Sequence, residues 1–254
     1  MDRCGRCDLI DAHCHIDLYP EPEKQLAYSQ RQGHTIIAVT NLPSHWKLGE
    51  PYFRGPKRIR QAVGLHPLLA QEHTIQERNL FQSIAQRCSY VGEVGLDYSP
   101  EGRESFQRQL ESFEFVLQTI ENQPKFLSIH SRSADGETLR LLTQFRRRQA
   151  VFHWYTGSLS MAEKILEQNH FFSINPAMIR GRKGQELLKI LPRTSVLTET
   201  DGPHINHAGM TIKPGEVNSV YEYLSDLWDL SESEVFSQIQ QNLTTILSSL
   251  KQSF

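Results

Sequence analysis

Short apolar runs alternate with longer amphipathic stretches along the whole chain. The apolar runs, which are rich in residues of high β propensity, are eight candidate strands: Leu9–Asp17, Thr35–Asn41, Arg60–His66, Tyr90–Asp97, Phe126–Arg132, Ala150–Tyr155, Phe171–Asn175 and Ser195–Asp201. Most of them are apolar on both faces, which is typical of parallel strands buried beneath helices. The pattern therefore predicts eight buried parallel strands.

The stretches between these runs repeat apolar residues at helical spacing. Phe106, Leu110, Phe113 and Leu117 follow this period within one such stretch, as expected of an amphipathic helix. The helices predicted in this way are Thr74–Arg87, Glu101–Asn122, Ala134–Arg148, Ser158–Gln168 and Arg182–Leu191. Strands and helices therefore alternate through most of the chain.

Two other segments carry local signals. Ser231 and Glu234 have the spacing of a capping box in front of the amphipathic run Val235–Leu250, which predicts a final helix. The segment Pro43–Pro56 holds three prolines and two glycines, which predicts an irregular connection or a brief helical turn.

Eight strand–helix units in 254 residues favour an α/β fold in which one (β/α)₈ TIM barrel forms the whole molecule. We expect a single domain over residues 1–254, with residues 1–7 as a flexible tail. An open doubly wound sheet is the alternative, and it would require a nucleotide fingerprint or a crevice where the strand order reverses. The chain contains no G-x-G-x-x-G sequence, so the barrel is favoured.

The charge balance limits how the protein meets other molecules. Lys and Arg total 27 against 29 Asp and Glu, so any affinity for nucleic acid must come from a local patch or from metal ions that meet phosphate. No apolar run is long enough to cross a bilayer, and no apolar stretch of a secretory signal precedes Asp11. We therefore expect a cytoplasmic protein without a membrane partner.

The four cysteines suggest no chemistry of their own. Cys4 and Cys7 have the spacing of a redox pair or half a zinc site, but no second such pair exists in the chain. Cys14 lies between two histidines in a predicted strand, so alternation turns it to the opposite face. Packing is the interpretation that we prefer for all four.

Candidate metal ligands occur where the predicted strands end. They are His13, His15, Glu93, His130, His153 and Asp201. The carboxyl ends of barrel strands meet on one face, where catalytic sites are built, and two residues separated by one position share a side of a strand. Imidazoles and carboxylates suit divalent transition metals, and six ligands exceed what one tetrahedral ion requires. The set predicts two ions that share a carboxylate and generate a metal-bound hydroxide.

Glu93 is the candidate for the shared carboxylate. It lies in an apolar, glycine-rich strand, where an ionised group is costly unless it is paired or coordinated. A buried ion pair with Arg or Lys is the alternative interpretation. We favour a bridging metal ligand because the other candidate ligands also lie at strand ends.

Six motifs in order resemble the TatD family of metal-dependent deoxyribonucleases. They are D-x-H-x-H, G-x-H-P, G-E-x-G-L-D, I-H-S-R, H-x-x-T-G and E-T-D-x-P, and they run from the first strand to Pro203. A weaker match continues through Lys213, Pro214 and Asn242. The resemblance implies an amidohydrolase-type barrel, two divalent ions (Zn, Mg or Mn) and hydrolysis of DNA phosphodiesters, with single strands or 3′ ends as substrates.

The resemblance also implies roles for individual residues. The metal ligands would be His13, His15, Glu93, His130, His153 and Asp201. Asp201 would accept the proton of the bridging water, while His66 and Arg132 would lie near the scissile phosphate. For Arg132, an ion pair on the barrel rim is an equal alternative.

Other residues on the same face are candidates for binding the substrate. Trp154 and Tyr155 begin the loop after the sixth strand and could stack an unpaired base, although core packing is an equal alternative for one of them. Arg180 and Lys183 follow the seventh strand and could track phosphates. The run Arg146–Arg148 precedes a strand at the opposite end, so we interpret it as structural.

The chain departs from the common family pattern at a few positions. Trp154-Tyr155 replaces Cys-Phe, and Ser173–Pro176 replaces a glycine-containing segment. These features are similar to the TatD-like component of Qat antiphage systems, which implies partners encoded in the same defence operon.

Two other functions compete with this interpretation. An amidohydrolase that cleaves C–N or C–O bonds of small molecules is disfavoured, because many such barrels use a carboxylated lysine that Tyr90–Ser99 lacks. A non-catalytic barrel subunit of a defence complex is disfavoured because all six candidate ligands are present.

Overall fold

The computed structural model describes residues 8–207, 209–248 and 250. The predicted flexible tail over residues 1–7, with Cys4 and Cys7, lies outside the described residues. Cys14 and Cys88 are buried free thiols, as the packing interpretation expects. Among the described helices, none has the length and apolar character needed to cross a bilayer.

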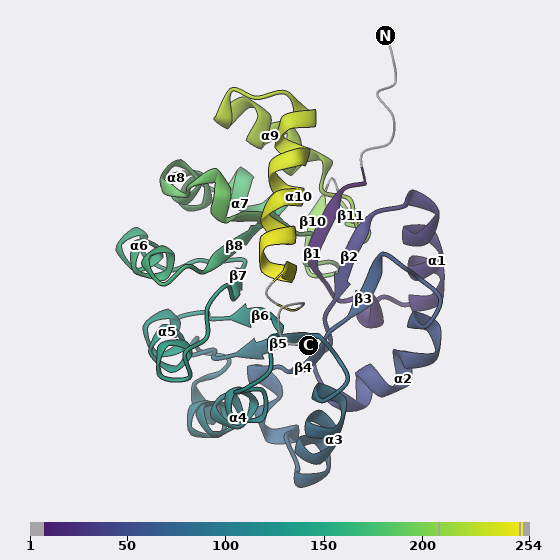
Figure 1. The fold of residues 1–254 in the computed structure, drawn as a ribbon, viewed down its shortest axis with the longest axis vertical. Coiled ribbons are helices and arrows are strands. Elements are labelled where there is room, and N and C mark those ends of the chain that lie inside the picture. The colour runs from purple at the N-terminus through teal and green to yellow at the C-terminus, as the bar shows by residue number, and fades with distance from the viewer. Residues whose placement is uncertain (1–7, 208, 249, 251–254) are drawn as a thin grey trace.

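Parallel strands form the centre of the molecule, surrounded by helices (Figure 1). One sheet joins β1 (Ile10–Cys14), β2 (Thr35–Ala38) and β3 (Ile59–Gln61). The second sheet has six strands in sequence order, namely β4 (Val63–Leu65), β5 (Tyr90–Gly95), β6 (Phe126–His130), β7 (Val151–His153), β8 (Phe171–Ile174) and β9 (Val196–Thr198). Every predicted strand is present, and the third is divided between β3 and β4, which pair with different neighbours.

Hydrogen bonds also connect strand segments that belong to different sheets. The amide of Thr40, just after β2, donates to the carbonyl of Gly92, and the amide of Glu93 donates to the carbonyl of Thr40. A Cβ at Gly64 would lie 1.8 Å from the Thr40 carbonyl oxygen, so only glycine allows this approach. Beyond β9, the amide of Asp201 donates to the carbonyl of His13 at 2.9 Å. These contacts join the end of β2 to β5 and the end of β9 to β1.

Helices follow most of the strands and lie outside them (Figure 1). Their bounds are α1 (Pro22–Gln32), α2 (Pro43–Phe53), α3 (Ile75–Ala85), α4 (Phe106–Thr119), α5 (Asp135–Gln144), α6 (Leu159–Glu167), α7 (Pro176–Arg180), α8 (Arg182–Ile190), α9 (Asn218–Trp228) and α10 (Glu232–Ser248). The predicted helices correspond to α3, α4, α5, α6, α8 and α10. Helices α1, α7 and α9 were not predicted. A short antiparallel pair, β10 (Asn206–His207) and β11 (Met210–Thr211), follows β9.

Helix α2 corrects one expectation. The prediction of an irregular or briefly helical connection over Pro43–Pro56 was wrong, because α2 is a regular helix of 11 residues. Pro43 occupies its first turn, where the missing N–H would have had no helical partner. Trp46 is buried on the inner face, and this burial outweighs the effect of Pro51 near the end of the helix.

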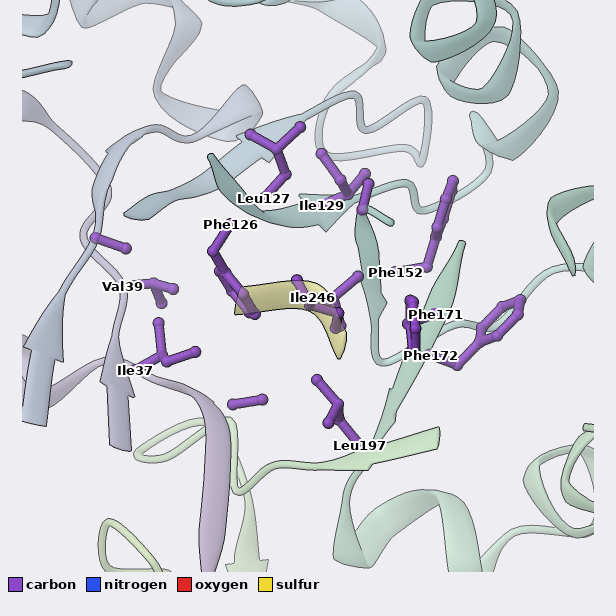
Figure 2. Packing of buried hydrophobic residues seen from close by; sticks show 14 of the residues in the cluster. Ile37, Val39, Phe126, Leu127, Ile129, Phe152, Phe171, Phe172, Leu197 and Ile246 are labelled. Atoms are coloured by element: carbon purple, nitrogen blue, oxygen red, sulfur yellow. The ribbon is translucent and has the colours of Figure 1, made fainter. Parts of the chain in front are cut away.

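Helix α10 covers the amino ends of the strands. Its capping box is present, because the Glu234 amide donates to the Ser231 hydroxyl and the Ser231 amide donates to the Glu234 carboxylate. Figure 2 shows Ile246 of this helix among the apolar side chains at the centre of the molecule, with Phe126 and Leu197 on facing strands. Apolar side chains therefore fill the amino end of the barrel. The carboxyl end is the one at which a functional site can form.

Candidate metal centre

The six predicted ligands meet at the carboxyl ends of the strands. They come from β1 and the residues just after it, from β5, from the last residues of β6 and β7, and from the turn after β9. A cavity of about 650 Å³ opens above them, and its lining includes His15, Glu93, His130, His153 and Asp201. His13 lies beneath it and is fully buried. The convergence follows from the parallel strands, since their carboxyl ends all point to one face.

One group of ligand atoms surrounds a single point. The distances to His13 Nε2 are 3.2 Å from His15 Nε2, 3.5 Å from Glu93 Oε2 and 3.4 Å from Asp201 Oδ1. The distances to His15 Nε2 are 3.0 Å from Glu93 Oε2 and 3.7 Å from Asp201 Oδ1. Atoms that bind one tetrahedral ion at about 2.1 Å lie roughly 3.4 Å apart. The four atoms therefore fit one divalent ion.

A second group gathers at the other oxygen of Glu93. Its Oε1 lies 2.5 Å from His130 Nδ1, 2.8 Å from His153 Nε2 and 3.3 Å from His66 Nε2. One carboxylate thus faces histidines on both sides. The donor set suits divalent transition metals.

An unsatisfied atom supports the fit of a metal ion. Asp201 Oδ1 is buried and has no hydrogen-bond partner among the described residues. A buried carboxylate oxygen without a partner is costly, and a cation at the first group would remove that cost.

Two polar residues that sequence reasoning missed hold the imidazoles in place. The Ser128 hydroxyl lies 2.7 Å from His13 Nδ1, and Asp97 Oδ2 lies 2.7 Å from His130 Nε2. In each case the partner meets the ring nitrogen that faces away from the metal position, which fixes the orientation of the ring. Alternation along β6 could have indicated Ser128, because it lies two residues before His130 and shares its side of the strand.

Glu199 is a buried carboxylate behind His153. It accepts hydrogen bonds from the Trp154 amide and the Asn175 side chain, both at 3.0 Å, and from the Ser173 hydroxyl. Its Oε1 also lies 3.8 Å from His153 Nδ1. These contacts connect β7, β8 and β9 behind the metal position.

The electrostatics favour a charged Glu93. Burial by itself raises the pKa of this carboxyl, but the imidazoles of His66, His153 and His130 hold the pKa well below its usual range. Burial and the neighbouring His153 lower the pKa of His13, yet the nearby carboxylates of Asp201 and Glu93 raise that pKa to about 9. A divalent ion at this position would compete with a proton, because imidazole coordinates a metal in its neutral form.

The residues expected near the phosphate lie on the cavity wall. His66 and Arg132 both line the cavity. Arg132 is exposed and lies 3.4 Å from the carboxylate of Glu101, which is exposed as well. The rim ion pair therefore exists, and its solvent-screened partner can be exchanged for another anion at low cost.

The two aromatic candidates have separate positions. Trp154 is half-buried and lines the cavity. Tyr155 is buried, and its hydroxyl donates to Asp135 at 2.9 Å and to the Ser158 carbonyl at 3.0 Å. Tyr155 therefore takes the core-packing alternative, because its ring is not available to stack a base.

The basic candidates lie farther along the same face. Arg180 is exposed and donates to the carbonyl of Asn206 at 3.4 Å. Lys183 is exposed and lines a neighbouring cavity that shares Thr156 with the metal cavity. By contrast, Arg147 donates to the carbonyl of Gln123 at 2.9 Å, in agreement with the structural interpretation of its basic run.

His204 was not counted as a ligand from the sequence, although it follows Asp201 on the same face, because histidines are common in loops. It lies with His15 and Asp201 in a group whose ligand atoms are within 4.8 Å of one another. Its ring centroid is 5.1 Å from that of His15. The structure therefore adds His204 to the candidate ligands.

Comparisons with known proteins agree with this geometry. The model of the family described as TatD related DNase matches residues 10–248. The chain is 24% identical to human "Deoxyribonuclease TATDN3", with 98% of each chain covered. It is 26% identical to the "Uncharacterized metal-dependent hydrolase YjjV" of Escherichia coli K12, with 94% of this chain and 98% of that protein covered.

Solved structures share the fold. The crystal structure of YjjV from Escherichia coli superposes with a TM-score of 0.82 at 23% identity, covering 96% of this chain and 98% of that one. A TatD family hydrolase from Entamoeba histolytica gives a TM-score of 0.78 at 15% identity, with 94% and 97% covered. These likenesses confirm the predicted α/β barrel fold class.

Proposed function

The chain belongs to the TatD related DNase family, and from this premise we propose that it is a metal-dependent phosphodiesterase that cleaves DNA. The observation that carries the proposal is the carboxylate of Glu93, which has histidines at both of its oxygens within one cavity. Such an arrangement suits two divalent ions a few ångströms apart, which is the geometry used for in-line displacement at phosphorus.

We propose zinc, magnesium or manganese as the ions. His13, His15, Glu93 and Asp201 would hold one of them, and Glu93, His130 and His153 would hold the other. When bound, two such ions lower the pKa of water and neutralise charge on the phosphoryl oxygens.

The residues of the chain supply the remaining steps. Asp201 would accept the proton of the attacking water at Oδ2, because Oδ1 faces His13 and His15 and would hold the ion. His66 and Arg132 line the cavity and donate hydrogen bonds to the non-bridging phosphate oxygens. For this, Arg132 exchanges the exposed carboxylate of Glu101 for phosphate, which its planar guanidinium binds well.

We also propose a path for the DNA strand. Trp154 lines the cavity and would stack an unpaired base. Arg180 and Lys183 would contact phosphates beyond it. The unpaired base at Trp154 favours single strands, and the family resemblance favours 3′ ends as substrates. Labelled single-stranded, double-stranded and 3′-blocked DNA distinguish these substrates, and equal cleavage of all three would contradict the preference.

The function is tested by Asp201→Asn. This variant should lose about 10²–10⁴-fold in kcat for DNA cleavage, because it lacks the proton acceptor. The matched control is Asp226→Asn, an exposed position on α9 outside the residues that line the cavity, and it should retain full activity. Cleavage by Asp201→Asn at the rate of the control, or by wild-type protein with metal removed by a chelator, would contradict the proposal.

The biological role that we propose is antiphage defence in the cytoplasm, together with proteins encoded in the same operon. Support comes from Trp154-Tyr155 and Ser173–Pro176, where the chain resembles the TatD-like component of Qat systems. Phage plating on cells that carry the operon tests this role. Equal efficiency of phage plating on cells with the wild-type protein and on cells with Asp201→Asn would contradict a role in defence.

A further inference from the structure

His204 is the candidate ligand that the proposed two-ion set leaves unused. Its side chain is exposed and forms part of the lining of the metal cavity. One ring nitrogen of His204, one of His15 and one carboxylate oxygen of Asp201 lie within 4.8 Å of one another. The His204 and His15 rings meet edge to face, with an angle of 82° between their planes. His204 is therefore next to two residues that face the first ion position.

The backbone on both sides of His204 is held in place. The His204 amide donates to the Asp201 carbonyl at 2.9 Å, which closes a tight turn between the two residues. The His15 amide donates to the carbonyl of Gly202 at 2.8 Å, so this turn is attached to the end of β1. After the turn, Ile205 is buried, and its carbonyl accepts a backbone hydrogen bond at 3.1 Å. The fold therefore fixes His204 beside His15 and Asp201.

The distances allow His204 to bind the same ion as these neighbours. Ligand atoms on opposite sides of an ion at about 2.1 Å lie roughly 4.2 Å apart. The 4.8 Å limit on the His204 group is close to this value, so a small rotation of the exposed ring is enough for its nitrogen to reach the ion. Asp201 Oδ1 lies 3.7 Å from His15 Nε2 and is buried without a hydrogen-bond partner among the described residues. An ion at this oxygen can therefore take His204 as a further ligand.

A further imidazole changes the kind of ion that the first position prefers. Without His204, this position offers the imidazoles of His13 and His15 and the carboxylates of Glu93 and Asp201. With His204, three of five ligands are imidazoles. Magnesium keeps several waters, and both magnesium and manganese prefer oxygen ligands. Zinc binds imidazole well and can become five-coordinate. A set of protein ligands that is rich in nitrogen therefore favours zinc.

We propose that His204 is a fifth ligand of the first ion and makes this position selective for zinc over magnesium and manganese. The inference rests on the proposed metal centre and deepens it, because that proposal names three ions without choosing among them. The second position has its own histidines, His130 and His153, at the other oxygen of Glu93. The selectivity that His204 supplies therefore belongs to the first position alone.

Zinc titration of the metal-free full chain tests the proposal. Affinity is measured against a competing chelator, together with the number of ions bound per chain. His204→Ala should weaken zinc binding at one position by at least about tenfold, a loss that follows even when a partner behind a ligand is removed. Because His204 is exposed, the variant should melt without metal at the wild-type temperature. His45→Ala is the matched control, since His45 is not among the residues that line the metal cavity, and it should bind zinc as the wild type does.

His204→Glu distinguishes the type of ligand from the loss of a ring. Its carboxylate keeps a donor at this position but replaces nitrogen with oxygen. Manganese affinity should therefore rise, and the ratio of zinc affinity to manganese affinity should fall below that of the wild type. An equal fractional loss of zinc and manganese affinity in both His204 variants would mean that His204 only shapes the loop, and it would overturn the proposal.

Two further outcomes would overturn the role of His204. One is an unchanged zinc affinity in His204→Ala. The other is a third zinc ion that His204→Ala loses while the affinity for the other two stays the same, because His204 would then hold an ion of its own.

DNA cleavage separates this inference from the proposed function. Zinc-selective binding through His204 in a protein that does not cleave DNA would contradict the nuclease proposal alone. Cleavage by the wild type, together with wild-type zinc affinity in His204→Ala, would contradict the role of His204 alone.

Discussion

Glu93 is a buried carboxylate that is costly to the folded state and also lies at the centre of the candidate site. Its burial would normally favour the neutral acid, yet the surrounding imidazoles hold its pKa well below the usual range. The protein tolerates the charge because His15 and His130 lie within 3.0 Å of its two oxygens. Removal of these partners would leave an uncompensated buried carboxylate, which is a large cost.

His170 is a buried histidine with the opposite behaviour. Its Nδ1 accepts from the Ala150 amide at 3.2 Å, and burial lowers its pKa from 6.5 to about 4. Between pH 6.5 and pH 4, His170 therefore binds a proton in the unfolded chain but stays neutral in the folded chain. The stability from neutral His170 is complete above pH 6.5 and declines as the pH falls toward 4.

This titration predicts a pH-dependent difference between wild type and His170→Gln, whose amide oxygen keeps an acceptor. From pH 7 to pH 5, wild type should lose about 2 kcal/mol more unfolding free energy than the variant, since each pH unit below 6.5 costs roughly 1.4 kcal/mol. Urea titrations at the two pH values measure this difference. Parallel losses in both proteins would show that His170 does not titrate as argued.

At the level of elements, α10 and the strands have distinct tasks. The carboxyl ends of the strands carry the candidate ligands, whereas α10 lies against their amino ends, where Asn242 donates to the carbonyls of Arg193 and Val196. Residues of α10 should therefore affect stability without affecting chemistry. Ile246 is 1% exposed and packs at the centre of the core (Figure 2).

Ile246→Ala tests this separation. The variant should lose about 2–5 kcal/mol of unfolding free energy, because a large buried side chain leaves a cavity. Its kcat below the unfolding transition should equal that of wild type. Gln240→Ala, at an exposed position of the same helix, serves as the control and should change neither quantity. A loss of kcat with intact stability would show that α10 is coupled to the site.

At the level of the whole molecule, the metal centre ties distant segments together. His13 and Asp201 are separated by most of the chain, yet His13 Nε2 and Asp201 Oδ1 lie 3.4 Å apart. A bound ion therefore stabilises the folded state alone, since the ligands of the unfolded chain are dispersed.

Metal removal should consequently lower the melting temperature. An ion at a hundred times its Kd contributes about 2.7 kcal/mol, which corresponds to roughly 5–10 °C for a domain of this size. Thermal scans with a chelator, and after addition of zinc, manganese or magnesium, measure the shift. Glu93→Gln is the control and should show a much smaller shift. An unchanged melting temperature of the wild-type protein after addition of the chelator would contradict a metal centre.

Local signals were sufficient for much of the fold. Apolar periodicity identified the strands and most helices, and the strand ends indicated candidate ligands that do converge, because parallel strands bring those ends to one face. They failed at α2, where Trp46 packing outweighed the prolines. They also failed at the third strand, which divides into β3 and β4 because Gly64 allows the Thr40 and Glu93 backbones to approach.

The sequence alone therefore determined which residues lie at strand ends and are candidate ligands, since residue spacing and strand alternation are short-range properties. Only the tertiary structure decided which oxygen of Glu93 faces which histidines and how Ser128 and Asp97 orient the rings. These features depend on contacts between segments far apart in the chain. No local pattern encodes such contacts, because they are fixed by the packing of the complete molecule.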